Sequence, residues 1–183
     1  MIDRDKILNI TPPGGPEDYI LEIAARNGTG QLAQLLHTHL GYGHVRGCVS
    51  GQAGQVDTEE VALPEGGGFT RNVDHFDLER DFYPYPSAHF KAILCLEVID
   101  TLTRDPMYMM DEIHRILRPG CSLILSTRRY TAGRIGSLLE NCGLEVTRLE
   151  TDDDCTYAAG RKIGALRDRY PVWLYPERSR RSD

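Results

Sequence analysis

Residues 90–127 constrain the fold of this chain more than any other stretch. Residues 90–98, FKAILCLEV, form a short apolar run that is typical of a strand buried on both faces. Asp105-Pro106 offers an N-cap acceptor and a proline at the first helical position, and Pro119-Gly120 marks the expected helix end. Residues 122–127 are again apolar. Strand, helix and strand in this order predict a right-handed parallel βαβ unit.

Composition and charge argue against nucleic-acid-binding, membrane-spanning and disulfide-rich classes of protein. The 183 residues have the length of one domain, and a net charge of −6 argues against a nucleic-acid partner, because phosphate backbones are bound by clustered Lys and Arg. No apolar run approaches the ~20 residues that span a bilayer, and the start lacks signal-peptide features. We therefore expect a cytoplasmic protein without a membrane partner. Five cysteines without CxxC spacing predict neither disulfides nor a metal site.

The pattern of residues 90–127 resembles the central region of class I S-adenosylmethionine (SAM)-dependent methyltransferases, which reads roughly FDxVLCxEVIEHL, then DP, EIxRVLxPGG and LST. The resemblance implies an α/β, Rossmann-like fold with a mostly parallel seven-stranded sheet, in the order 3-2-1-4-5-7-6 with strand 7 antiparallel. We expect one domain in residues 1–165 and a tail in residues 166–183. The tail's aromatic residues favour packing on the sheet or on a partner chain, as in a homo- or hetero-oligomer.

The turn after the expected strand at residues 19–24 is where the family binds SAM. The family's (D/E)xGxGxG pattern is matched at Glu22 and at its last glycine, Gly28. Ala24 and Arg26 stand where the first two glycines would be. The resemblance nevertheless implies that all four residues contact the cofactor.

Two further segments complete the expected cofactor site. Asp77 matches the family's acidic residue that meets the adenine amino group, with Leu78 as its neighbour. A turn carboxylate is the alternative reading of Asp77. Ligands of open α/β sheets lie beyond the carboxyl ends of the strands where strand order reverses. This rule adds Cys95, Leu96 and Glu97 to the expected crevice.

Several positions depart from the family pattern. Val49 replaces the acidic residue that accepts hydrogen bonds from the ribose hydroxyls. Thr101 stands where relatives often carry a histidine. Cys121 replaces the second glycine of PGG, where a positive φ would be costly for a side chain. Residues 50–69, rich in glycine and polar residues, predict a poorly ordered connection in place of the family's helix.

Two functions from different classes follow. One is SAM-dependent methyl transfer to a small metabolite or glycan-type substrate, with no catalytic residue identified, because positioning supplies much of the rate of such reactions. The other is a non-catalytic protein of the same fold that acts as an interaction subunit with weak or lost SAM binding. It accounts for Ala24, Arg26 and Val49 together. The sequence leaves both open.

Overall fold

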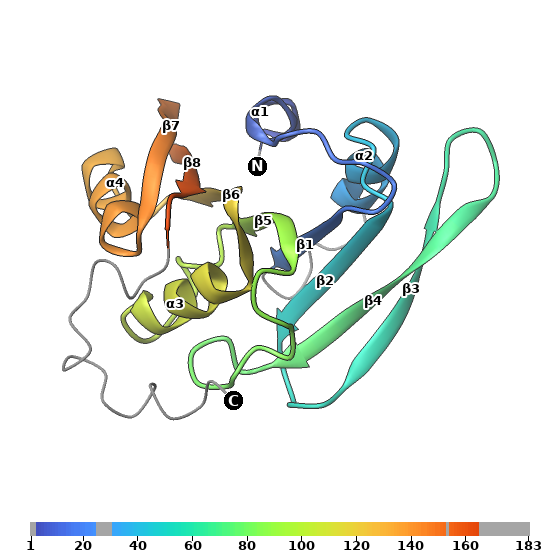
Figure 1. Ribbon diagram of the computed structural model, residues 1–183, viewed down its shortest axis with the longest axis horizontal. Helices are drawn as coiled ribbons and strands as arrows, with labels where there is room; N and C mark the ends of the chain where they lie inside the picture. The colour runs from blue at the N-terminus through green and yellow to red at the C-terminus, as the bar shows by residue number, and fades with distance from the viewer. Residues whose placement is uncertain (1–2, 25–30, 153, 165–183) are drawn as a thin grey trace.

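The computed structural model describes residues 3–24, 31–152 and 154–164, which build one sheet of eight strands in the order β3-β4-β2-β1-β5-β6-β8-β7 (Figure 1). Pairing is parallel from β4 through β2, β1 and β5 to β6, and antiparallel for β3 with β4, β6 with β8, and β8 with β7. The strands are β1 (Tyr19–Ala24), β2 (His44–Ser50), β3 (Val56–Ala62), β4 (Gly68–Phe76), β5 (Phe90–Leu96), β6 (Leu117–Thr127), β7 (Leu144–Asp152) and β8 (Cys155–Lys162).

The four helices of the described residues cover both faces of the sheet. They are α1 (Arg4–Ile10), α2 (Gln31–Thr38), α3 (Met107–Ile116) and α4 (Ala132–Asn141). Alternate residues of β1 point to opposite faces, so Leu21 packs with α3 and α4 residues while Ile20 packs with α1 and α2 residues. Fully burying such a side chain stabilises the fold by about 1.5–3 kcal/mol. The result is a three-layer α/β domain.

The predicted strand order is confirmed, with one strand added. β4, β2, β1, β5, β6, β8 and β7 take the order expected for strands 3-2-1-4-5-7-6. The poorly ordered connection expected at residues 50–69 was wrong, because residues 56–62 form β3, which pairs with β4 from Val56–Asp74 to Ala62–Gly68. Figure 1 shows this hairpin projecting beyond the rest of the sheet. Gly66 and Gly67 take φ values of 92° and 75° at its tip, a geometry that glycine allows without strain.

The central βαβ unit forms as predicted, with two corrections. The Asp105 carboxylate accepts the N–H of Met107 at 2.9 Å at the start of α3. The helix ends at Ile116, before Pro119-Gly120, which lies within β6. The positive φ expected at Cys121 is absent, because Gly120 takes it with a φ of 75°. Replacing the second glycine by cysteine therefore causes no backbone strain.

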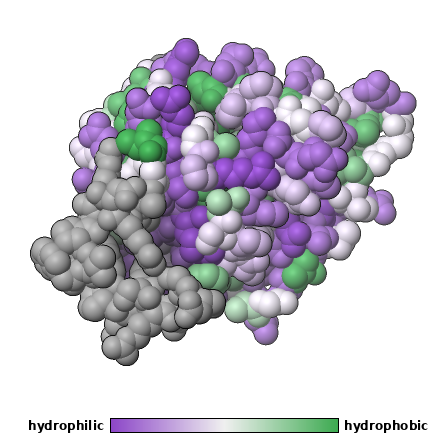
Figure 2. All heavy atoms as spheres, viewed as in Figure 1, coloured by the Kyte–Doolittle hydropathy of each residue, from purple (hydrophilic) through white to green (hydrophobic). Residues whose placement is uncertain are grey.

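Exposed apolar side chains of the described residues are scattered over the surface. Figure 2 shows a face on which hydrophilic residues predominate and apolar residues are scattered. Among the described residues, the exposed large hydrophobic side chains are those of Val56, Phe82, Leu149 and Ile163, which belong to separate segments. Single exposed apolar residues are ordinary on a protein surface. In the described part of the chain, no helix is both long and apolar enough to span a membrane.

Candidate functional site

The carboxyl ends of β1 and β5 lie side by side at the point where strand order reverses. Ile23 pairs with Cys95 and Ala24 with Leu96. Burial raises the pKa of Cys95 to about 12, so its thiol stays protonated and unreactive. Cys95 and Leu96 belong to the two cores rather than to an open surface. Glu97 is partly exposed, and the chain returns to the core at Val98 and Ile99.

A hollow of about 440 Å³ lies beyond the ends of β5 and β6. Its volume falls in the range of pockets for small ligands. Glu97, Asp100 and Thr101 line it from the segment after β5, and Arg128 and Arg129 from the segment after β6. Of these five residues, the sequence predicted a site role for Glu97 alone.

Glu97 has an unusual backbone conformation. Its φ of 56° lies in the left-handed region, which costs a non-glycine residue on the order of 1–3 kcal/mol. Its N–H donates to the Ser126 carbonyl at 2.9 Å and to the Ser126 hydroxyl at 3.2 Å, and these bonds hold the conformation. Its Oε1 accepts a hydrogen bond from Arg128 Nε at 2.6 Å. Such local strain clusters at functional sites.

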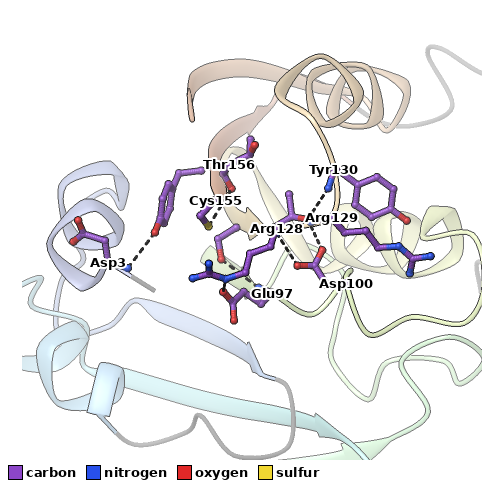
Figure 3. A network of polar contacts seen from close by, with 11 residues as sticks. Asp3, Glu97, Asp100, Arg128, Arg129, Tyr130, Cys155 and Thr156 are labelled. Atoms are coloured by element: carbon purple, nitrogen blue, oxygen red, sulfur yellow. Dashed lines mark hydrogen bonds and ion pairs between the residues drawn. The ribbon is translucent and has the colours of Figure 1, made fainter. Parts of the chain in front are cut away.

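Asp100 ties the two sides of the hollow together (Figure 3). Its Oδ1 accepts from the Thr127 hydroxyl, and its Oδ2 accepts the backbone N–H of Arg128 at 2.7 Å. The Thr127 oxygen in turn accepts the N–H groups of Arg129 and Tyr130 at 3.2 and 3.3 Å. This network fixes where the chain leaves β6 and so directs both arginine side chains.

Glu22 lies in a buried ion cluster on the opposite side of β1 from the α3 layer. Arg71 of β4 donates from Nη1 to Glu22 at 2.7 Å and from Nε to Glu59 of β3 at 3.0 Å. The Arg71 and Glu22 side chains are 0% and 2% exposed. Burial raises the pKa of Glu22, and the Arg71 charge opposes that shift. We name Glu22, Arg71 and Glu59 the buried triad after its two buried members, since the Glu59 side chain is 33% exposed.

A glycine on the intervening strand makes the buried triad sterically feasible. β2 lies between β4 and β1, and its Gly47 has no side chain above that face. A Cβ atom at this position would lie 3.1 Å from Val73 Cγ2 and 3.6 Å from Arg71 Cζ. Arg71 therefore reaches across β2 to Glu22. A carboxylate held this way faces its arginine rather than a ligand.

The position of the missing ribose acid is apolar and closed. Val49, at the end of β2, is 7% exposed and packs with Ala24 and Val73 in a small cluster. The nearby Asp77 serves a turn, since its Oδ1 accepts the Glu79 N–H at 2.9 Å. This observation agrees with the turn alternative, although 43% exposure leaves the Asp77 carboxylate accessible.

The other residues predicted to contact the cofactor lie either in the core or outside the described residues. Leu78 is buried at 3% exposure in the core. Arg26 and Gly28 lie outside the described residues. The cofactor roles of all nine expected residues stay predictions. Sequence reasoning missed Arg71, Arg128 and Arg129, although two arginines directly after a buried strand were a usable signal.

An open α/β sheet with a hollow beyond its strand ends, next to the reversal between β1 and β5, is the architecture of a doubly wound α/β domain. The family model described as "Methyltransferase domain" matches residues 23–125, more than half of the chain. The protein therefore belongs to this methyltransferase family, and the predicted resemblance is confirmed. The family match supports SAM as the cofactor. No curated protein matches the chain.

Solved structures share the fold at low identity. A SAM-dependent methyltransferase from Mesorhizobium loti has a TM-score of 0.64 and 13% identity, covering 86% of this chain and 96% of that one. A chain of the complex between the Haloferax volcanii Trm112 methyltransferase activator and a methyltransferase gives 0.61 and 14%, covering 87% and 88%. Geranyl diphosphate C-methyltransferase from Streptomyces coelicolor gives 0.58 and 11%, covering 87% and 78%. At these identities the likeness shows the fold alone.

Proposed function

We propose that the protein transfers a methyl group from SAM to a small metabolite or glycan-type substrate. The cofactor would lie over the ends of β1 and β5, and the acceptor would enter the hollow lined by Glu97 and Arg129. The observation that carries this proposal is the hollow itself, with a strained Glu97 directly after β5. Its position agrees with the general rule for ligands of open α/β sheets.

Methyl transfer makes modest chemical demands on such a site. The acceptor atom attacks the sulfonium methyl in line, and holding the two reactants in that geometry supplies much of the rate. The network around Asp100 fixes the end of β6 against the segment after β5. A fixed wall of this kind can orient an acceptor without taking part in bond making.

Calorimetric titration with SAM and with S-adenosylhomocysteine tests the proposal. Val49 cannot accept the ribose hydrogen bonds, each of which contributes roughly 1.5–3 kcal/mol when charge-assisted. We therefore expect weak binding, with a dissociation constant of about 10⁻⁴ M if relatives bind at micromolar levels. Comparable heats for the product S-adenosylhomocysteine would support a shared cofactor site. If neither ligand gives a heat of binding at millimolar concentration, the proposed methyltransferase activity is wrong.

The buried triad favours a second candidate, a non-catalytic interaction subunit. Glu22, the residue that matches the family's acidic position, is held by Arg71 at 2.7 Å. Val49 closes the ribose position with an apolar cluster. A methyltransferase fold in complex with a protein partner has a precedent in the Haloferax volcanii assembly with Trm112. The predicted oligomer through the C-terminal tail falls on residues outside the description.

The two candidates differ in cofactor binding and in assembly. Light scattering coupled to size exclusion, on the full chain with and without SAM, gives its mass in solution. A subunit without cofactor binding would show no heat in the titration and no change in thermal stability with SAM. An enzyme would gain stability by RT ln(1 + [L]/Kd), about 2.7 kcal/mol at 100 times the dissociation constant.

A further inference from the structure

Most polar groups around the hollow already have partners. Both Asp100 oxygens accept hydrogen bonds from the end of β6. Glu97 accepts a hydrogen bond from Arg128 at 2.6 Å. The Thr101 hydroxyl donates to the Val98 carbonyl at 2.7 Å. A ligand that enters the hollow therefore finds few free polar groups.

Arg129 is the exception. Its backbone N–H is fixed on the Thr127 hydroxyl at 3.2 Å, and its guanidinium lies 6.0 Å from the centre of the Tyr130 ring. Within the described residues no carboxylate pairs with it. Figure 3 shows the Arg129 and Tyr130 side chains extending to one side of the network, away from Arg128. Arg129 is an exposed residue of the lining, and a guanidinium without an acidic partner among the described residues is suited to bind an anion.

The proton acceptors of the lining are its two carboxylates, Glu97 and Asp100, and both already accept hydrogen bonds from the end of β6. The five described residues around the hollow include no histidine, cysteine, lysine or tyrosine. An alcohol or an ammonium group must lose a proton before or during methyl transfer, and general bases usually supply that step. A carboxylate is already deprotonated at neutral pH. The hollow thus matches an acceptor that carries its own negative charge.

We propose that the acceptor is the carboxylate of a small molecule held by Arg129, an inference that rests on the proposed function. One carboxylate oxygen binds the guanidinium and the other attacks the methyl carbon of SAM. The new bond joins oxygen to the methyl group, the sulfur–methyl bond breaks, and its electron pair remains on sulfur. The products are a methyl ester and S-adenosylhomocysteine, and no proton is transferred.

The geometry of the β6 end agrees with a small, accessible acid. Only residues 128–131 separate β6 from α4, so no long segment between these elements covers the hollow. Arg128 is directed to Glu97, which leaves Arg129 as the group that an incoming anion meets.

The test uses the full chain with S-adenosyl-[methyl-¹⁴C]methionine and a small-molecule extract of the source cells, freed of macromolecules by filtration. Carboxyl methyl esters release volatile labelled methanol in mild alkali, whereas methyl ethers and methylated amines do not. We expect a labelled, base-labile product. Arg129→Gln should lower its formation at least tenfold through a raised KM, since a charge-assisted hydrogen bond is lost. Arg148→Gln, on the exposed Arg148–Glu150 pair of β7, should leave it unchanged.

The outcomes separate this inference from the function on which it rests. SAM titrations of all three proteins come first, and Arg129→Gln should bind SAM like the parent. If the parent does not bind SAM, the proposed function fails and the inference with it. If SAM binds but the product is base-stable, absent or unaffected by Arg129→Gln, the carboxylate inference alone is overturned.

Discussion

Two clusters of acids and arginines differ in burial, and this difference separates their roles. In the buried triad, the Arg71 and Glu22 side chains are 0% and 2% exposed. At the mouth of the hollow, those of Arg128 and Glu97 are 37% and 32% exposed. Buried charges must keep their partners because water cannot replace them, whereas half-exposed charges can exchange partners.

Glu22 and Glu97 were both predicted to lie at the cofactor site, and their burial differs. The family resemblance placed Glu22 beside the cofactor, and the rule for ligands at strand ends placed Glu97 there. Partial exposure leaves the Glu97–Arg128 pair accessible at the hollow, whereas burial and pairing assign Glu22 to holding β1 against the β3–β4 hairpin through Arg71. Residue type alone did not distinguish a carboxylate at a surface from one that crosses a sheet.

The largest expected effect comes from breaking the buried triad. Arg71→Met leaves Glu22 as a buried carboxylate without its cation, and removing one partner of a buried pair costs roughly 3–5 kcal/mol. Denaturant unfolding of the variant and the parent measures this loss. The double variant Arg71→Met/Glu22→Gln should recover part of it, because the uncompensated charge is gone. A loss below about 1 kcal/mol would place the triad with ordinary surface pairs.

The pH dependence of the unfolding free energy tests Glu22 of the buried triad without removing Arg71. Burial raises the pKa of Glu22, so the native protein binds this proton more readily than the unfolded chain does. The contribution of Glu22 to stability is then greatest at low pH and falls as pH rises through the raised pKa. Relative to Glu22→Gln, the parent should lose stability from about pH 4.5 upward. Both proteins keep His114, whose lowered pKa of about 4 cancels in the difference.

The next prediction concerns SAM affinity and Val49, which lies in the apolar cluster at the end of β2. Val49→Asp restores an acceptor for the ribose hydroxyls and should strengthen SAM binding at least tenfold, about 1.4 kcal/mol. Val49→Asn has nearly the same shape without the charge and should gain less in the same titration. If Val49→Asp gains nothing, adding Arg26→Gly tests whether the Arg26 side chain excludes the cofactor. Equal affinities for all variants would mean that SAM binds elsewhere.

The strand order was predictable because buried parallel strands carry a local sequence signal. β1 and β5 are short, mostly apolar runs, β6 contains one at residues 123–125, and the Asp105 carboxylate accepts the Met107 N–H at the start of α3. β3 was missed because Val56–Ala62 is mostly exposed and charged, so its stability depends on pairing with β4 rather than on an apolar pattern.

The site was harder to predict because its contacts join distant segments. Arg71 meets Glu22 across 49 residues of sequence, and only the strand order with Gly47 between them makes that contact possible. Likewise Asp100 meets Arg128 across 28 residues. Glu97 was predicted because it directly follows an apolar strand, whereas its left-handed backbone depends on Ser126 in the neighbouring strand.

The smallest expected change in unfolding free energy is at the Arg128–Glu97 pair at the mouth of the hollow. Arg128→Gln removes the pair with Glu97, and because both side chains are about one third exposed, unfolding free energy should change by less than about 1 kcal/mol. The Ser126 hydrogen bonds keep Glu97 in its left-handed conformation, so the fold around the hollow should persist. Any loss should shrink further at 1 M salt, where the screening length is about 3 Å, while the loss in Arg71→Met should not. A salt-insensitive loss of several kcal/mol in Arg128→Gln would contradict this prediction. The Arg128–Glu97 pair would then stabilise the fold as the buried triad does, and it would not be free to exchange partners with a ligand.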